Sequence, residues 1–282
     1  EALIALNPEL GHAGGPNAAE NLDLVLHEIN QAILDAQNGL VAANERVTVM
    51  LRGDHSFVTV DGKHVPRRFI DFEDPDSNRL VVSDEVTIRG GVKPRRFDVV
   101  YYVNGIPLVV AETKTPVKRE VSWVNAADDI YRTYEVEYPQ FFATNVFNVA
   151  TEGLEFRMGP IRAEPDPESE IWAPWGALTD VPSKMTGPAR VERGARLLLR
   201  AEVILPMLRD LVMFRHARDA SEQDVKFLPR YPQFEATLDI HQKVLSGRRG
   251  GLIWHHQGSG KTELMAFAAA RILRDPKVVE RF

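Results

Sequence analysis

The middle of the chain reads Phe97-Asp98-Val99-Val100-Tyr101-Tyr102-Val103-Asn104-Gly105-Ile106-Pro107-Leu108-Val109-Val110-Ala111-Glu112-Thr113-Lys114. Both halves of this run are rich in β-branched and aromatic residues, which strands prefer. The Asn104-Gly105 pair between them is a strong short-range signal for a tight turn that joins antiparallel strands. Residues 97–114 therefore predict a β-hairpin.

The hairpin carries a set of charged residues that fits metal-dependent cleavage of phosphodiesters. Asp98 lies on the first strand, and Glu112 and Lys114 lie on the second. Two carboxylates and the backbone carbonyl of Thr113 offer the oxygen ligands that Mg²⁺ prefers. Lys114 follows Glu112 by two residues and shares its face of the strand, where its side chain would orient or deprotonate the attacking water. We predict Asp98, Glu112 and Lys114 as catalytic residues, and Asp98, Glu112 and Thr113 as metal ligands.

The register of the hairpin sets a condition on this site. A plain two-residue loop at Asn104-Gly105 would pair Asp98 with Ala111 and leave Asp98 and Glu112 on opposite faces of the sheet. The site therefore requires one extra residue, and we expect a β-bulge closed by Gly105 in the left-handed conformation. The alternative is that Glu112 and Lys114 are only the exposed positions of a strand end. The apolar run before them argues against it, since such runs form strands covered on both faces.

The flanking sequence predicts an α+β domain with a mostly antiparallel sheet. Apolar residues recur at helical spacing over 21–38, and a second helix is expected over 121–134. Short β-rich runs predict strands in Val47–Leu51, Ser56–Val60, Leu80–Val82 and Phe141–Ala150.

A Pro-rich, irregular stretch between about Arg162 and Pro188 marks the expected domain boundary. We predict a first domain over 1–162, a Pro-rich linker and helical connector over 163–226, and a further unit over 227–282. The connector contains an expected helix over 196–213, where apolar residues again recur at helical spacing.

A phosphate-binding loop is predicted near the end of the sequence. A buried strand over 251–257 leads into Gly258-Ser259-Gly260-Lys261-Thr262, and a helix is expected over 263–273. Backbone N–H groups at such a strand-to-helix turn point at one place, which suits a triphosphate. Lys261 would reach the β and γ phosphates of ATP, and the Thr262 hydroxyl would bind Mg²⁺. The strict pattern has Gly where this chain has His255.

Gln233 and Tyr231 are candidates for contacts with the adenine of ATP. They lie in Leu228-Pro229-Arg230-Tyr231-Pro232-Gln233-Phe234, upstream of the phosphate loop, and this segment resembles the aromatic and Gln element that reads adenine in superfamily 2 motors. A side-chain amide suits adenine because it donates and accepts on the N6/N7 edge at once. The alternative is that Gln233 only caps the start of a helix.

Together these segments resemble the restriction (R) subunit of type I restriction-modification enzymes. The hairpin resembles its PD-(D/E)xK nuclease core, and the phosphate loop resembles motif I of superfamily 2 helicases. Arg68-Phe69-Ile70-Asp71-Phe72 and residues 142–153 also resemble that subunit. The resemblance implies a restriction-endonuclease-like mixed sheet flanked by helices, followed by the beginning of an α/β RecA-like motor over 227–282.

The resemblance also implies a function. It implies Mg²⁺-dependent cutting of double-stranded DNA coupled to ATP-driven translocation, in a complex with modification (methyltransferase) and specificity subunits. Two departures are visible: the Pro before the first Asp is Phe97 here, and the Gln-x-x-x-Tyr helix has Tyr131 but no Gln four residues before it. Tyr131 and Arg132 are weak candidates for DNA contacts.

Composition bounds these predictions. The net charge is −6, which argues against recognition of nucleic acid by bulk positive charge, so local basic clusters matter more. The chain has no cysteine, and no apolar run approaches the roughly 18 residues of a membrane span, so we expect a cytoplasmic protein without membrane association. Candidate phosphate contacts are Arg67-Arg68, Lys93 with Arg95-Arg96, Lys118-Arg119 and Arg248-Arg249, although each is also a plausible solvated surface.

Two other functions fit parts of the sequence. One is a DNA translocase or remodeller whose hairpin domain only binds DNA, and the other is a stand-alone Mg²⁺-dependent nuclease with a degenerate nucleotide site. The sequence starts without Met, so we expect it to belong to a longer chain. It has no acidic second motor motif or arginine finger after Lys261, so we expect this stretch alone not to hydrolyse ATP efficiently.

Overall fold

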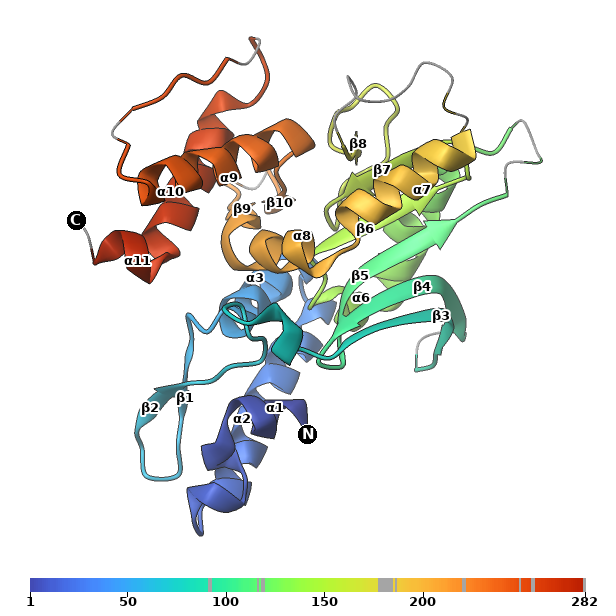
Figure 1. Cartoon of the computed structure of the whole chain (residues 1–282). Coiled ribbons are helices and arrows are strands. Elements are labelled where there is room, and N and C mark those ends of the chain that lie inside the picture. The colour runs from blue at the N-terminus through green and yellow to red at the C-terminus, as the bar shows by residue number, and fades with distance from the viewer. Residues whose placement is uncertain are drawn as a thin grey trace.

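The centre of the molecule is a six-stranded mixed sheet. The computed structural model describes residues 1–90, 93–115, 117, 120–176, 185, 187–219, 222–248, 250–254 and 257–280. In spatial order the strands are β3 (Leu80–Ile88), β4 (Arg95–Val103), β5 (Ile106–Thr113), β6 (Phe147–Thr151), β7 (Phe156–Gly159) and β8 (Ala173–Pro174). Only β5 and β6 are parallel, and all other neighbouring strands are antiparallel. The predicted hairpin over 97–114 is confirmed as β4 and β5 (Figure 1).

The parallel pair exists because a helical crossover joins β5 to β6, as parallel strands require. The crossover comprises α4 (Trp123–Asp128), the π-helical turn η5 (Asp129–Tyr134), α5 (Glu135–Glu137) and α6 (Pro139–Phe142). The helix predicted over 121–134 is therefore confirmed. The strand predicted over 141–150 begins later, because α6 occupies its first residues.

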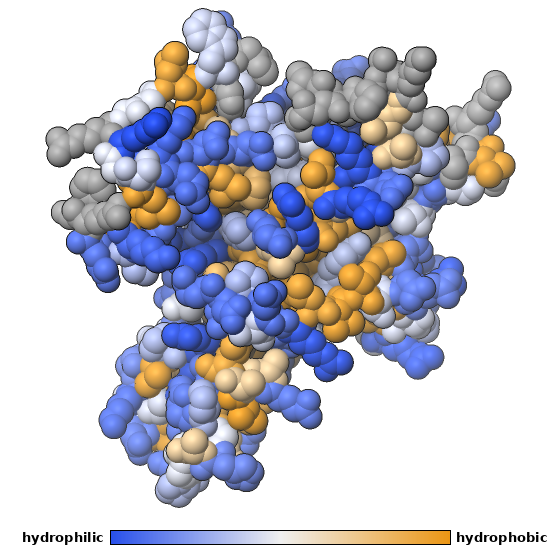
Figure 2. All heavy atoms as spheres, viewed as in Figure 1, coloured by the Kyte–Doolittle hydropathy of each residue, from blue (hydrophilic) through white to orange (hydrophobic). Residues whose placement is uncertain are grey.

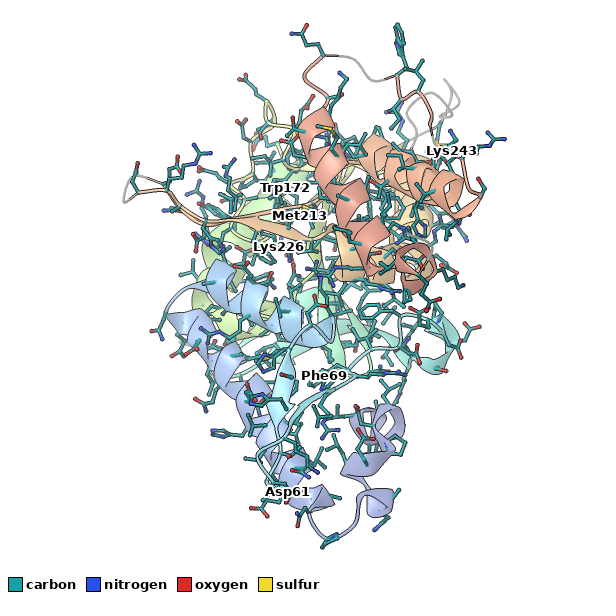
Figure 3. The ribbon with its side chains drawn as sticks, turned by 90° about the vertical axis from the view of Figure 1, so that its left-hand side faces the viewer. Asp61, Phe69, Trp172, Met213, Lys226 and Lys243 are labelled. Carbon is teal, nitrogen blue, oxygen red and sulfur yellow. The ribbon has the colours of Figure 1, made fainter. Side chains whose placement is uncertain are left out.

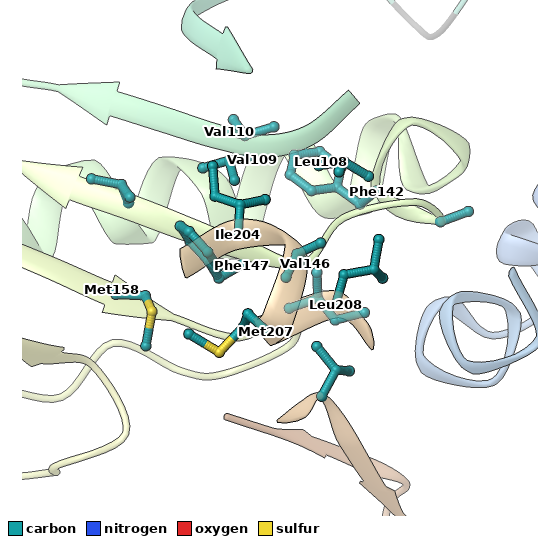
Figure 4. Packing of buried hydrophobic residues seen from close by; sticks show 14 of the residues in the cluster. Leu108, Val109, Val110, Phe142, Val146, Phe147, Met158, Ile204, Met207 and Leu208 are labelled. Atoms are coloured by element: carbon teal, nitrogen blue, oxygen red, sulfur yellow. The ribbon is translucent and has the colours of Figure 1, made fainter. Parts of the chain in front are cut away.

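Helices cover both faces of the sheet. The connector folds as α7 (Gly187–Leu198), α8 (Ala201–Pro206) and the π turn η7 (Met207–Leu211), so the single helix predicted over 196–213 is broken. Ile204, Met207 and Leu208 pack on one face beside Val109 and Phe147 (Figure 4). The crossover lies on the other face, where Ala126, Ala127 and Ile130 are completely buried. As a result all five residues of β6 are buried.

The amino-terminal part is helical and lies at one end of the sheet (Figure 1). Its helices are α1 (Ala2–Leu6), η1 (Pro8–Leu10), η2 (His12–Gly14), α2 (Ala18–Leu34), η3 (Asp35–Gln37) and α3 (Leu40–Leu51). A small hairpin of β1 (Ser56–Val58) and β2 (His64–Pro66) follows, and η4 (Pro75–Ser77) precedes β3. The helix predicted over 21–38 is confirmed by α2 and η3. The strand predicted over 47–51 is wrong: Val47, Met50 and Leu51 are the buried face of α3, because helical spacing outweighs their β-propensity.

The carboxyl-terminal part is helical around the phosphate loop. A two-stranded pair, β9 (Met213–Arg215) and β10 (Val225–Phe227), leads to α9 (Tyr231–Leu245), α10 (Lys261–Arg274) and α11 (Pro276–Val279). The helix predicted over 263–273 is confirmed by α10. Among the described residues no helix has the length and apolarity needed to cross a membrane.

The buried strand predicted before the phosphate loop is wrong for residues 251–254. They have no regular structure, and the side chains of Leu252 and Trp254 are 83% and 89% exposed. In Figure 2, apolar side chains of this segment protrude at the top of the view. A strand needs a neighbouring strand for its backbone hydrogen bonds, and no strand of the described residues pairs with this segment. His255 and His256 lie outside the described residues.

Candidate active site and phosphate loop

The hairpin contains the extra residue that the site requires. Val103 pairs with Ile106 across the turn, but Tyr101 pairs with Val109, so Leu108 is an additional residue in β5. The predicted bulge is therefore confirmed, and its predicted position at Gly105 is wrong. The cause is that Asn104 and Gly105 both take positive φ angles, 54° and 83°, and complete a two-residue turn by themselves.

The bulge at Leu108 is held from the neighbouring part of the sheet. The backbone N–H of Val146, just before β6, donates to the Leu108 carbonyl over 2.7 Å. The Thr144 hydroxyl donates to the carbonyl of Pro107 over 2.6 Å. These bonds fix the register shift in β5.

The register makes Asp98 and Glu112 neighbours across β4 and β5. The last pair of the two strands is Val99 with Ala111, and the next residues along them are Asp98 and Glu112. If the strands continue at this register, both carboxylates lie on one face of the sheet. Lys114 follows two residues later on that face. Asp98 accepts hydrogen bonds at Oδ2 from the Thr113 backbone N–H (2.9 Å) and hydroxyl (2.7 Å), which fix its orientation.

Glu112 is a buried carboxylate with one oxygen in use. Its side chain is 3% exposed, and Oε1 accepts from the Lys114 ammonium over 2.6 Å. Oε2 is buried and has no hydrogen-bond partner among the described residues. Burial raises the pKa of Glu112 to about 7, against the lowering effect of Lys114. A buried carboxylate oxygen without a hydrogen-bond partner is a fitting ligand for a divalent cation.

Lys114 bridges two carboxylates. Its Nζ also lies 2.6 Å from Oδ2 of Asp129, in the first position of the π turn η5. Burial lowers the pKa of Lys114, but its hydrogen bonds to Asp129 and Glu112 outweigh burial and raise it. The sequence did not single out Asp129, because nothing in it distinguishes Asp129 from Asp128.

A metal ion here would depend on few ligands. Within the part of the chain that the structure describes, no three His, Asp or Glu side chains are arranged to hold a metal ion. The expected Mg²⁺ ligands, Asp98, Glu112 and the Thr113 carbonyl, remain predictions, and the unpartnered Oε2 of Glu112 is the observation that fits them.

Several candidate DNA contacts are already engaged within the chain. Arg67 is buried and paired with Glu9, and Arg95 forms a two-pronged pair with Glu137. Arg132 pairs with Asp128 and Glu164, and the Tyr131 ring lies 4.4 Å from the Arg162 guanidinium carbon. Lys118, Arg119 and Arg249 lie outside the described residues.

The predicted phosphate loop forms a tight turn into a helix. Gly258 and Gly260 have φ angles of 81° and 73°, in the left-handed region that favours glycine. Helix α10 begins directly after Gly260, so Lys261 and Thr262 lie exposed at its amino terminus. The hydroxyl of Ser259 is buried and has no hydrogen-bond partner among the described residues. The first turn of α10 therefore presents backbone donors and a positive dipole end beside Lys261.

Gln233 lies against this loop, as the first residues of α9 approach it. Its Nε2 donates to the Gly260 carbonyl over 2.9 Å, and its Oε1 accepts from the Arg230 N–H over 2.8 Å. Gln233 therefore caps α9, which is the alternative interpretation of this residue, and it also supports the loop. Tyr231 packs against Trp175 with ring centroids 5.5 Å apart. Contact of either residue with adenine remains a prediction.

A cavity of about 1070 Å³ adjoins Tyr231. It lies between α9 and the segments 167–176 and 250–254, and its lining includes both Tyr231 and Trp254. Residues 258–262 are not among its lining residues, so this cavity is separate from the phosphate loop.

Ion pairs tie the phosphate-loop helix to the rest of the molecule. Arg271 of α10 pairs with the buried Asp210 of η7 over 2.6 Å, and Arg274 pairs with Asp54 over 2.6 Å. Lys226 of β10 lies near the centre of the molecule (Figure 3), where its buried ammonium donates to the Asn145 carbonyl. The loop, the connector and the sheet thus form one packed body.

Comparison with known proteins gives similarities to both parts of the chain. Residues 1–166 match the family described as type I restriction enzyme R protein N terminus, and residues 232–280 match SWI2/SNF2 ATPase. The chain is 27% identical over 290 residues to the type I restriction enzyme HindI endonuclease subunit of Haemophilus influenzae, covering 99% of this chain and 26% of that protein.

A second relative comes from Methanocaldococcus jannaschii and is named "Putative type I restriction enzyme MjaVIIP endonuclease subunit". It is 29% identical over 208 residues, which cover 72% of this chain and 19% of that protein. The chain therefore spans about a quarter or less of the length of these relatives.

Proposed function

Because the chain belongs to the family of the type I restriction enzyme R protein N terminus, we propose that it carries the nuclease site of an ATP-dependent DNA-cutting subunit. The observations that support this most directly are the bulged register, which ends with Val99 paired with Ala111 next to Asp98 and Glu112, and the Lys114 ammonium 2.6 Å from Glu112. The reaction is Mg²⁺-dependent hydrolysis of phosphodiester bonds in double-stranded DNA.

Each residue of the site has its own role in this reaction. Asp98, Glu112 and the Thr113 carbonyl would hold Mg²⁺, which supplies Lewis-acid catalysis and a template for the phosphate. Thr113 orients Asp98 through two hydrogen bonds. Lys114, which its carboxylate partners keep protonated, orients the attacking water and stabilises the negative charge that develops on the phosphate.

The phosphate loop supplies the second part of the proposal. We infer that Gly258, Ser259, Gly260, Lys261 and Thr262 bind ATP at the start of a RecA-like motor, with Gln233 and Tyr231 at the adenine. The similarity of residues 232–280 to SWI2/SNF2 ATPase supports this part. The motor would translocate DNA, and the subunit would act with modification (methyltransferase) and specificity subunits in the cytoplasm.

The test is a DNA cleavage assay of the complete assembly with Asp98→Ala and Lys261→Ala, with and without ATP. Loss of cleavage by Asp98→Ala with DNA binding retained supports the nuclease. Unchanged cleavage would instead favour a translocase whose hairpin domain only binds DNA. Cutting that survives Lys261→Ala would favour a stand-alone nuclease with a degenerate nucleotide site.

A further inference from the structure

The crossover helix widens by one residue beside the nuclease site. Residues Asp129–Tyr134 form a π turn between α4 and α5. In a regular α-helix, residues five positions apart point about 140° away from each other. A π turn closes its hydrogen bonds over five residues and brings such a pair toward one face, and π turns often occur at functional sites. The extra residue thus brings Asp129 and Tyr134 to a common side.

Both residues lie beside the site carboxylates. Asp129 lies 2.6 Å from the Lys114 ammonium, and burial together with the nearby Glu112 and Asp129 raises the pKa of Tyr134. The Asp129 side chain is 47% exposed, so its ion pair contributes little to stability. The position of Asp129 is therefore better explained by a role in the nuclease site than by a contribution to the stability of the fold.

We propose that Asp129 is a positioning residue for Lys114, and that the π turn places it there. This inference rests on the proposed nuclease function. Lys114 is shared between Glu112 and Asp129. With Glu112 engaged by Mg²⁺, Asp129 would still hold the Lys114 ammonium in place. Tyr134 is buried, with its ring 4.8 Å from that of Phe97.

The neighbouring Asp128 is a matched control within the same helix. Its carboxylate pairs with Arg132 over 2.6 Å, one turn along the helix, instead of with Lys114. Asp128→Asn and Asp129→Asn therefore remove the same charge from adjacent positions, and only the second removes a contact with the site.

The experiment measures single-turnover DNA cleavage by the full-length subunit in its complete assembly over a series of Mg²⁺ concentrations. Asp129→Asn should slow cleavage about 10- to 100-fold, as loss of a partner of a site residue does. The Mg²⁺ requirement, DNA binding and ATP hydrolysis should be unchanged. Asp129→Glu, which keeps the charge, should recover part of the rate, and Asp128→Asn should stay within about twofold.

Three outcomes would overturn the inference. They are wild-type cleavage by Asp129→Asn, equal losses in both Asn variants, and a raised Mg²⁺ requirement, which would make Asp129 a metal ligand. Lys114→Ala separates this inference from the proposed function. If Lys114→Ala cuts like the wild type, the nuclease assignment itself fails. If Lys114→Ala is inactive while Asp129→Asn is normal, only the role of Asp129 fails.

Discussion

Asp98 and Glu112 are the residues that follow the pair of Val99 with Ala111 on β4 and β5, although the turn that joins these strands has only the two residues Asn104 and Gly105. A two-residue turn alone would put the carboxylates on opposite faces of the sheet. The extra residue Leu108 in β5 corrects the register. The geometry of the proposed nuclease site thus depends on a bulge within the strand.

Lys261 tests the link between the two sites. Lys261→Ala should reduce ATP hydrolysis by the full-length subunit by at least about 100-fold, because it removes a charge expected at the β and γ phosphates. ATP-dependent cleavage should fall with it, as measured by paired ATPase and DNA cleavage assays. Lys277→Ala, an exposed lysine of α11, should leave both activities unchanged. If the Lys261→Ala variant cleaved DNA as fast as the wild type, cleavage would not depend on this nucleotide site, and the prediction would be contradicted.

Gln233 is predicted to act both on the loop and on the base of ATP. Gln233→Ala removes its bonds to Gly260 and Arg230, so the free energy of unfolding should fall by about 1–3 kcal/mol. It should also reduce the preference for ATP over GTP, measured as the ratio of the two dissociation constants. Gln242→Ala, an exposed residue of the same helix, is the control. An unchanged nucleotide preference would leave Gln233 with a capping role alone.

Glu135 predicts a pH dependence of stability. Burial raises the pKa of Glu135 from 4.5 to about 7, while its bonds to Arg162 and Asn148 act in the opposite direction. Between these values the unfolded chain has lost the proton and the folded chain still holds it. The free energy of unfolding should therefore decrease as pH rises through this window, by up to about 3 kcal/mol.

Glu135→Gln removes this titration, so its unfolding free energy should change less between pH about 5 and about 8. The measurement is chemical denaturation of both proteins at the two pH values. Glu137→Gln is a matched control, because the hydrogen bond from Arg95 lowers the pKa of Glu137 and keeps it ionised throughout. Parallel curves for wild type and Glu135→Gln would contradict the prediction.

Part of the site follows from the sequence alone. Side chains in a strand alternate between the two faces of the sheet. Asp98 and Glu112 can therefore share a face only if the hairpin contains one extra, unpaired residue, whatever the rest of the fold. The place of that residue does not follow. It depends on the bond from Val146 to the Leu108 carbonyl, between residues far apart in the chain.

Other features depend on context that short patterns lack. Val47, Met50 and Leu51 have strand-like neighbours, but their burial beside the rest of α3 makes them helical. Residues 251–254 have the composition of a buried strand, yet no described strand lies beside them to pair with. Asp129, and not Asp128, pairs with Lys114, and Asp129 is the first residue of the π turn. No pattern in the sequence indicates this π turn.

The most direct test of the nuclease site is single-turnover cleavage of double-stranded DNA by the full-length subunit in its assembly, with Asp98→Ala compared with Asp84→Ala. Asp84 is exposed on the adjacent strand β3 and is paired with Val99, so it faces the other side of the sheet from Asp98. We expect Asp98→Ala to lower the Mg²⁺-dependent cleavage rate by more than about 100-fold, since losing a metal ligand costs more than losing a ligand's partner. Asp84→Ala should cut normally, and both variants should bind DNA and hydrolyse ATP. Wild-type cleavage by Asp98→Ala would contradict the assignment of this hairpin as a nuclease.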